Sequence, residues 1–83
     1  MMSRSKQARR NRQARTMRMV REVFPIGATM YSRQVKDKLV DAYGVKNAFI
    51  PSSPEAMGWH LKKDGGFTKI ELSLRHYMWR RDE

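Results

Sequence analysis

The chain has 83 residues and no cysteine, and its 18 lysines and arginines outnumber its 8 acidic residues, which gives a formal net charge of +10. This length predicts one domain with a small core, and the lack of cysteine excludes a disulfide framework and a thiolate zinc site. The apolar runs are far shorter than the roughly 20 residues that span a bilayer. We therefore expect a cytoplasmic protein, in the host cytoplasm or nucleoid if its source is viral, with nucleic acid and not a membrane as its partner.

The positive charge is concentrated near the N-terminus. Residues 1–21 hold eight arginines and lysines and no acid, whereas residues 22–83 hold ten basic and eight acidic side chains. Residues 1–12 are polar, basic and without apolar periodicity, so the sequence predicts a disordered arm there and a folded domain over 13–83. The cations assigned to this arm and its continuation, which would contact phosphates, are Arg4, Lys6, Arg9, Arg10, Arg12 and Arg15.

The first predicted helix begins at about residue 13. Met17 and Phe24 recur at helical spacing, and Pro25 closes the segment. The β-prone stretch 28–31 follows, and it is too short to be stable unless it pairs with strands elsewhere in the chain.

A second helix is predicted over 33–43. Ser32 is suited to be its N-cap, because a serine hydroxyl accepts hydrogen bonds from the free N–H groups of a first turn. Gly44 is suited to end the helix. In the loop that follows, the large apolar side chains of Phe49 and Ile50 are expected to hold the turn against the core.

The best-marked segment is a third helix over 54–63. Ser53 is suited to be its N-cap, Pro54 has the fixed φ of a first helical position, and Gly65 or Gly66 can adopt the left-handed conformation that ends a helix. Helical spacing divides the side chains between a core face and an outer face. The core face carries Pro54, Met57 and Leu61, and the outer face carries Glu55, Trp59, Lys62 and Lys63.

Residues 67–80 alternate imperfectly between apolar and polar side chains, which is typical of half-buried strands. The sequence predicts two strands with a tight reversal near Ser73 and Leu74, and it places Ile70, Leu72 and Leu74 on the same side. A fourth helix over 72–81 is the alternative.

Segment 53–67 combines a capped helix, a small Gly58, a Leu-Lys-Lys run, Gly-Gly-Phe and then an alternating stretch. It resembles the recognition helix and first wing strand of winged helix-turn-helix DNA-binding domains. The predicted order of helix, short strand, helix, helix, strand and strand over 13–81 fits that family. The resemblance implies an α+β fold, a small winged helix of three helices plus a short β-sheet or wing, preceded by the disordered basic arm.

The resemblance also implies that helix 54–63 lies in the major groove, where a few side chains reach base edges and others fix the helix on phosphates. Ser52 and Ser53 are expected to help fix its start, and the N-terminus of the second helix offers free N–H groups to phosphate. The competing interpretation is that each basic residue is a solvated surface charge. For Trp59, the competing interpretation is that its side chain packs on the wing. The remaining residues expected at DNA, from both helices and from the wing or its end, are Glu55, Trp59, Lys62, Lys63, Arg33, Lys36, Lys69, Arg75, Arg80 and Arg81.

Three functional hypotheses follow. The first is a double-stranded DNA-binding protein, a small transcriptional regulator whose arm strengthens binding through phosphates or the minor groove; homodimers are compatible with this family. The second begins from residues 9–15, Arg-Arg-Asn-Arg-Gln-Ala-Arg, which are similar to the arginine-rich RNA-binding peptides of phage antiterminators and imply an RNA-hairpin partner. The third is a protein-interaction module, because many winged helices use the same helix for protein partners.

Enzyme chemistry finds little support in the sequence. Asp37 and Asp41 lie on a lysine-rich helix, where pairing with Arg33 and Lys38 accounts for them. The two histidines are far apart in the sequence and lack a third ligand at suitable spacing. We therefore expect no catalytic activity, no metal and no cofactor.

Overall fold

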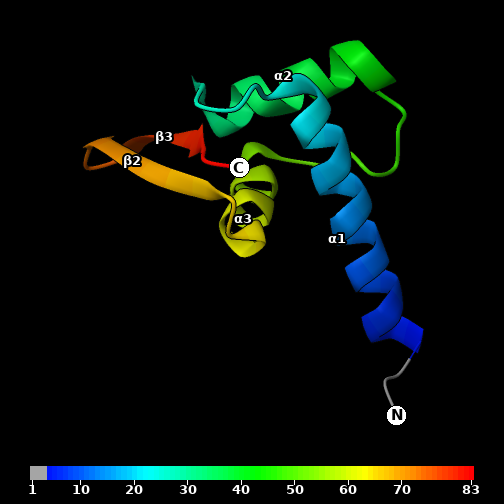
Figure 1. The fold of residues 1–83 in the computed structure, drawn as a ribbon. Helices are drawn as coiled ribbons and strands as arrows, with labels where there is room; N and C mark the ends of the chain where they lie inside the picture. The colour runs from blue at the N-terminus through cyan, green and yellow to red at the C-terminus, as the bar shows by residue number, and fades with distance from the viewer. Residues whose placement is uncertain (1–3) are drawn as a thin grey trace.

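The computed structural model describes the backbone of residues 4–83 and the side chains of residues 10–83. Within this range the chain forms three helices and a small antiparallel sheet (Figure 1). This arrangement is a winged-helix-like topology, and it confirms the predicted α+β class and order of elements. The elements are α1 (Arg4–Val23), β1 (Thr29–Met30), α2 (Ser32–Tyr43), α3 (Pro54–Asp64), β2 (Phe67–Ser73) and β3 (His76–Arg81).

Helix α1 is longer than predicted, because it begins at Arg4 and not near residue 13. No glycine or proline interrupts it, and most of its first ten residues have high helix propensity. Its C-terminal half packs on the domain, and its N-terminal half extends away from it (Figure 1). Met17 and Val20 are buried, as the apolar spacing predicts. The disorder expected for residues 1–12 concerns the free chain in solution and stays a prediction; residues 1–3 lie outside the described range.

Helix α2 is capped one residue earlier than predicted. Tyr31 is the N-cap and Ser32 is the first helical residue, so the capping role assigned to Ser32 is wrong. The reason is the side chain of Gln34, whose Oε1 accepts a hydrogen bond of 2.8 Å from the backbone N–H of Tyr31 and so closes the first turn. At the other end Gly44 has a φ of 91° and donates its N–H to Val40 O at 2.8 Å, which confirms the predicted stop.

Strand β3 is the central strand of the sheet, with β1 on one side and β2 on the other, all antiparallel. Trp79 of β3 is opposite Met30 of β1 and also opposite Lys69 of β2. The short strand β1 therefore has the partner that its stability requires. Residues 67–81 form a hairpin, so the alternative of a fourth helix over 72–81 is wrong.

The side chains at the far end of the hairpin are exposed on both faces. Leu72 and Leu74 are 55% and 102% exposed, so the burial suggested by their alternation with Ile70 is wrong. The hairpin extends sideways past the helices (Figure 1), and no second layer covers its tip. Its buried side chains lie at its base, where Phe67 and Trp79 join the core formed with the three helices.

A cluster of polar contacts joins α1 to α3 and to the end of β3. The guanidinium of Arg21 binds both carboxylate oxygens of Asp64, at 2.5 and 3.2 Å. Arg81 donates to the backbone oxygens of Arg21 and Phe24, at 3.0 and 2.7 Å. These contacts fix the C-terminal end of α3, and therefore its direction, relative to α1.

Two ion pairs predicted on α2, Arg33–Asp37 and Lys38–Asp41, are not formed among residues 10–83. All four side chains are exposed. An exposed pair gains little over two solvated charges, so helical spacing alone does not bring these side chains together.

Candidate nucleic-acid interface

Helix α3 has the two faces that its sequence predicts. The Ser53 hydroxyl accepts a hydrogen bond of 3.1 Å from Ala56 N, and Gly65 ends the helix in the left-handed conformation with φ 86°. Met57 and Leu61 have no exposed surface. The core therefore anchors one side of α3, and the helix presents its other side outward.

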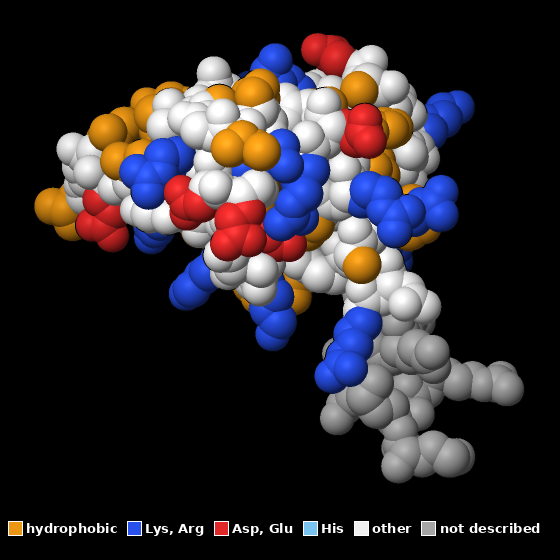
Figure 2. Space-filling view, in the orientation of Figure 1, with side chains coloured by type: hydrophobic (Ala, Val, Ile, Leu, Met, Phe, Trp, Pro, Cys, Tyr) orange, Lys and Arg blue, Asp and Glu red, His pale blue; other side chains and the backbone are white. Residues whose placement is uncertain are grey.

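The outer face of α3 is basic and aromatic. Trp59 is 55% exposed, and the side chains of Lys62 and Lys63 are exposed on either side of it. Lys63 Nζ lies 5.6 Å from the centre of the Trp59 ring, within the range of a cation–π contact. Lysine and arginine side chains project from the lower edge of the body, beneath α3 (Figure 2).

A cleft of about 490 Å³ separates the outer face of α3 from the hairpin. On the hairpin side, Lys69 Nζ lies 4.2 Å from the centre of the Tyr77 ring, and the Tyr77 and Trp79 rings meet edge to face at 6.0 Å. The sequence analysis did not assign Tyr77 to the site. The signal that would have found it is the two-residue spacing from Trp79, which puts both rings on one side of β3. The cleft is lined by Glu55, Gly58, Trp59, Lys62, Phe67, Lys69, Tyr77 and Trp79.

The loop before α3 is held by α1. Thr16 Oγ1 donates to Phe49 O at 2.7 Å, and Arg12 donates to Ala48 O at 2.8 Å. The Arg15 guanidinium lies 4.7 Å from the centre of the half-buried Phe49 ring. Arg12 and Arg15, two cations assigned to the arm, thus lie against the domain. The sequence analysis did not identify Phe49 as the residue on which they pack.

His60 joins α3 to α1. Its Nδ1 is in close contact with Gln13 Oε1, and Gln13 Nε2 donates to the backbone oxygen of His60 at 3.2 Å. Burial lowers the pKa of His60 from its usual value, and the nearby charge of Arg12 lowers it further. This histidine therefore has a positioning role in which the neutral imidazole is favoured.

The other predicted contact residues are spread over the surface. Arg33 is exposed and Lys36 half-buried on α2, while Ser52 and Arg75 are exposed before α3 and at the hairpin turn. Arg80 is exposed and binds Asp82 at 2.9 Å. Hydrogen bonds from Thr68 and Arg80 lower the pKa of Asp82. Arg81 is half-buried against α1, so the fold uses its charge inside the domain.

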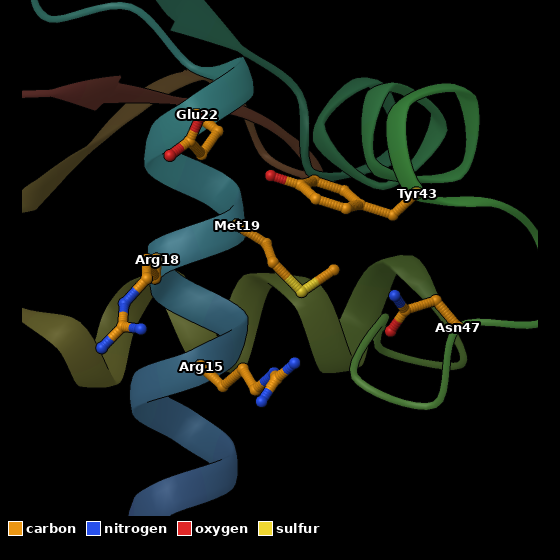
Figure 3. A pocket seen from close by; sticks show the side chains of 6 residues that line it. All are labelled: Arg15, Arg18, Met19, Glu22, Tyr43 and Asn47. Atoms are coloured by element: carbon orange, nitrogen blue, oxygen red, sulfur yellow. The ribbon is translucent and has the colours of Figure 1, made fainter.

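A second pocket, of about 280 Å³, lies between α1 and the C-terminal end of α2. In Figure 3, Tyr43 and Asn47 face α1 from one side, with Met19 between them and the helix axis. Arg15 and Glu22 give the pocket charges of both signs. With Arg18, these residues leave the pocket an excess of one positive charge, but the pocket lies between two helices and not on an exposed helix face.

Among residues 10–83, no three His, Asp or Glu side chains are grouped so that they could hold a metal ion. None of the helices within residues 4–83 is long and apolar enough to cross a membrane.

The fold and the exposed basic face of α3 define the chain as a winged-helix-like α+β domain. Comparison with protein families, with curated proteins and with solved structures gives no match.

Proposed function

We propose that this chain binds double-stranded DNA by placing α3 in the major groove and that it acts as a small transcriptional regulator. The observation that supports this proposal is the division of α3 into an anchored face and an exposed basic face beside the hairpin. A major groove about 12 Å wide admits one helix, and lysine side chains on it reach base edges or phosphates.

The elements around α3 supply positioning contacts in this proposal. The free N–H groups at the start of α2 and the Glu55 N–H in the first turn of α3 are donors to phosphate, with Arg33 and Ser52 exposed beside them. Lys69 and Arg75 on the hairpin would contact the backbone or the minor groove. Glu55 is exposed in the first turn of α3, where a carboxylate accepts from a cytosine amino group.

The test is fluorescence anisotropy of the full chain with a mixed-sequence duplex at about 0.15 M salt. A site-selection experiment with the full chain then supplies the specific duplex. Lys63→Ala is expected to weaken specific binding by about 1–3 kcal/mol if Lys63 contacts a base, and to weaken all duplexes alike if it contacts phosphate. Lys38→Ala is the matched control, because Lys38 is an exposed helical lysine on α2. Equal effects of the two variants would contradict the proposal.

A second candidate function is RNA-hairpin binding through α1. The observation that favours it is the continuity of α1 from Arg4, which makes the arginine-rich run 9–15 part of one helix. Against it, Arg12 and Arg15 lie over the Phe49 ring, at 5.8 and 4.7 Å. An RNA hairpin in the same titration separates the two functions: preference for the hairpin by about tenfold, or 1.4 kcal/mol, would favour α1 as the functional element.

A further inference from the structure

The cleft between α3 and the hairpin has aromatic side chains on both walls. Trp59 stands on the α3 side, Tyr77 and Trp79 stand on the hairpin side, and Phe67 lies where the two elements meet. The volume of about 490 Å³ falls in the range of about 300–1,000 Å³ that is typical of small-molecule sites. Phe67 and Trp79 are buried, so the rings that a ligand can reach are the exposed Trp59 and the half-buried Tyr77. A contact with the phosphate backbone alone does not require these rings.

Gly58 lines the cleft where α3 packs closely against α2 and β3. A Cβ atom at this position would lie 3.2 Å from Ser32 Oγ, 3.6 Å from Tyr77 Oη and 3.9 Å from Trp79 Nε1. Three polar groups from α2 and β3 therefore converge beside Gly58. The indole N–H of Trp79 is buried there without a hydrogen-bond partner in the part of the chain that the structure describes, and a buried donor without an acceptor is costly.

The charges at the cleft favour a nucleotide over an apolar ligand. Lys62 and Lys69 line the cleft from opposite elements, and both side chains are exposed. The contact of Lys69 with Glu71 is long, at 4.0 Å, and exposed pairs of this kind are weak. Lys69 Nζ also lies 4.2 Å from the centre of the Tyr77 ring, so a base that stacks on Tyr77 would displace it toward a phosphate. Aromatic rings between cations are the arrangement by which proteins hold unpaired bases and the backbone around them.

We propose that this cleft binds one unpaired nucleobase of a DNA duplex, stacked on Trp59 and Tyr77, while Lys62 and Lys69 contact the phosphates on either side of it. This proposal rests on the proposed DNA-binding function. An unpaired base leaves the helical stack at a lower cost than a paired one, so the cleft gives the domain a preference for bulged or otherwise locally opened duplex. The Tyr77 hydroxyl and the Glu55 carboxylate, which line the cleft, are the polar groups available to the base edge.

The experiment compares two duplexes of the same sequence, one fully paired and one with a single unpaired nucleotide, by anisotropy titration of the full chain. The unpaired nucleotide is 2-aminopurine, whose fluorescence falls when it stacks on an aromatic ring. We expect the bulged duplex to bind about tenfold more tightly, within the range that stacking of one base supplies, and its fluorescence to fall on binding.

Variants then assign the effect to the cleft. Trp59→Leu keeps an apolar side chain at an exposed position but removes the ring, so the preference and the quenching should disappear, and Trp59→Phe should restore part of both. Lys69→Ala tests the hairpin wall in the same way and should reduce the preference. Arg33→Ala is the matched control, because Arg33 is an exposed proposed phosphate contact on α2 and does not line the cleft; it should weaken both duplexes by one factor. Circular dichroism checks that each variant is folded.

The outcomes separate the two proposals. Equal affinity for the two duplexes overturns the cleft proposal and leaves DNA binding intact. A preference that survives in Trp59→Leu also overturns it, because the selectivity then lies elsewhere on the protein. Failure to bind either duplex overturns DNA binding and the cleft proposal together.

Discussion

The contact between Arg21 and Asp64 should be the most important single polar interaction for the stability of this domain. It is bidentate, at 2.5 and 3.2 Å, and only 34% and 15% of the two side chains are exposed. Asp64 also accepts a hydrogen bond of 3.1 Å from Gly66 N at the entrance to β2. Replacement of Asp64 by alanine therefore removes an ion pair, leaves a partly buried guanidinium without its partner and frees a backbone donor.

The expected cost of Asp64→Ala follows from these contacts. Breaking a fully buried pair costs about 3–5 kcal/mol, and an exposed pair is worth about 0.2–1 kcal/mol. This pair is intermediate in burial, so we expect a loss of about 2–3 kcal/mol in the free energy of unfolding, including the hydrogen bond to Gly66. For a domain of this size each kcal/mol lowers Tm by about 4–8 °C, which makes the change large.

Urea unfolding, followed by tryptophan fluorescence and circular dichroism, measures this loss. Glu71→Ala is the matched control, because it breaks the exposed Lys69–Glu71 contact of 4.0 Å and should cost no more than about 0.5 kcal/mol. Adding Arg21→Met to Asp64→Ala should cost less than the sum of the two single changes. If Asp64→Ala were as stable as Glu71→Ala, the pair would not hold α3 to α1 as inferred.

Three further predictions concern other parts of the molecule. Gly58→Val should lower the free energy of unfolding by about 1–3 kcal/mol through overpacking. The control Ala42→Val, at an exposed position of α2, should cost less, and urea unfolding measures both. The pKa of His60 is lowered in the folded state, so its contribution to stability is present above the unfolded pKa of about 6.5 and is lost as pH falls below it. The free energy of unfolding, measured between about pH 7 and 5, should show this loss. The loss should be absent in His60→Gln and should remain in His76→Gln. Glutamine at the four cations of residues 4–10 should lower the salt slope of DNA binding by about 0.9 for each phosphate contact removed; an unchanged slope would exclude these residues from the interface.

Helix ends could be predicted where the residues that cap or end the helix lie next to it in the sequence. Ser53 and Pro54 mark the start of α3, Gly65 marks its end, and the structure uses all three. The start of α1 was not predicted, because a run of charged residues lacks the apolar periodicity by which a helix is recognised, although it contains no residue that breaks one. Composition favours disorder there, whereas propensity favours helix.

The contacts of the hairpin could not be derived from alternation alone. Alternation tells which side chains share a side of a strand, but not how far the neighbouring helices reach along it. Phe67 and Trp79 are buried because they lie beside the core, and Leu74 is exposed because it lies at the turn. The two walls of the cleft come from α3 and from both strands of the hairpin, and their side chains meet only after the sheet has formed.

The same tertiary contacts change which cations the arm can offer to a polyanion. The sequence groups Arg12 and Arg15 with the cations before them, but in the structure both lie over Phe49, and Arg12 also binds Ala48 O. To contact a phosphate beyond the domain, either guanidinium would have to exchange this protein contact for the new one, so its net contribution to binding is smaller. Arg4, Lys6, Arg9 and Arg10 precede these two residues, on the part of α1 whose backbone extends away from the domain (Figure 1). For this reason the substitutions that test the arm belong there, where they change the salt dependence of binding without disturbing the contacts that hold α1 to the loop before α3.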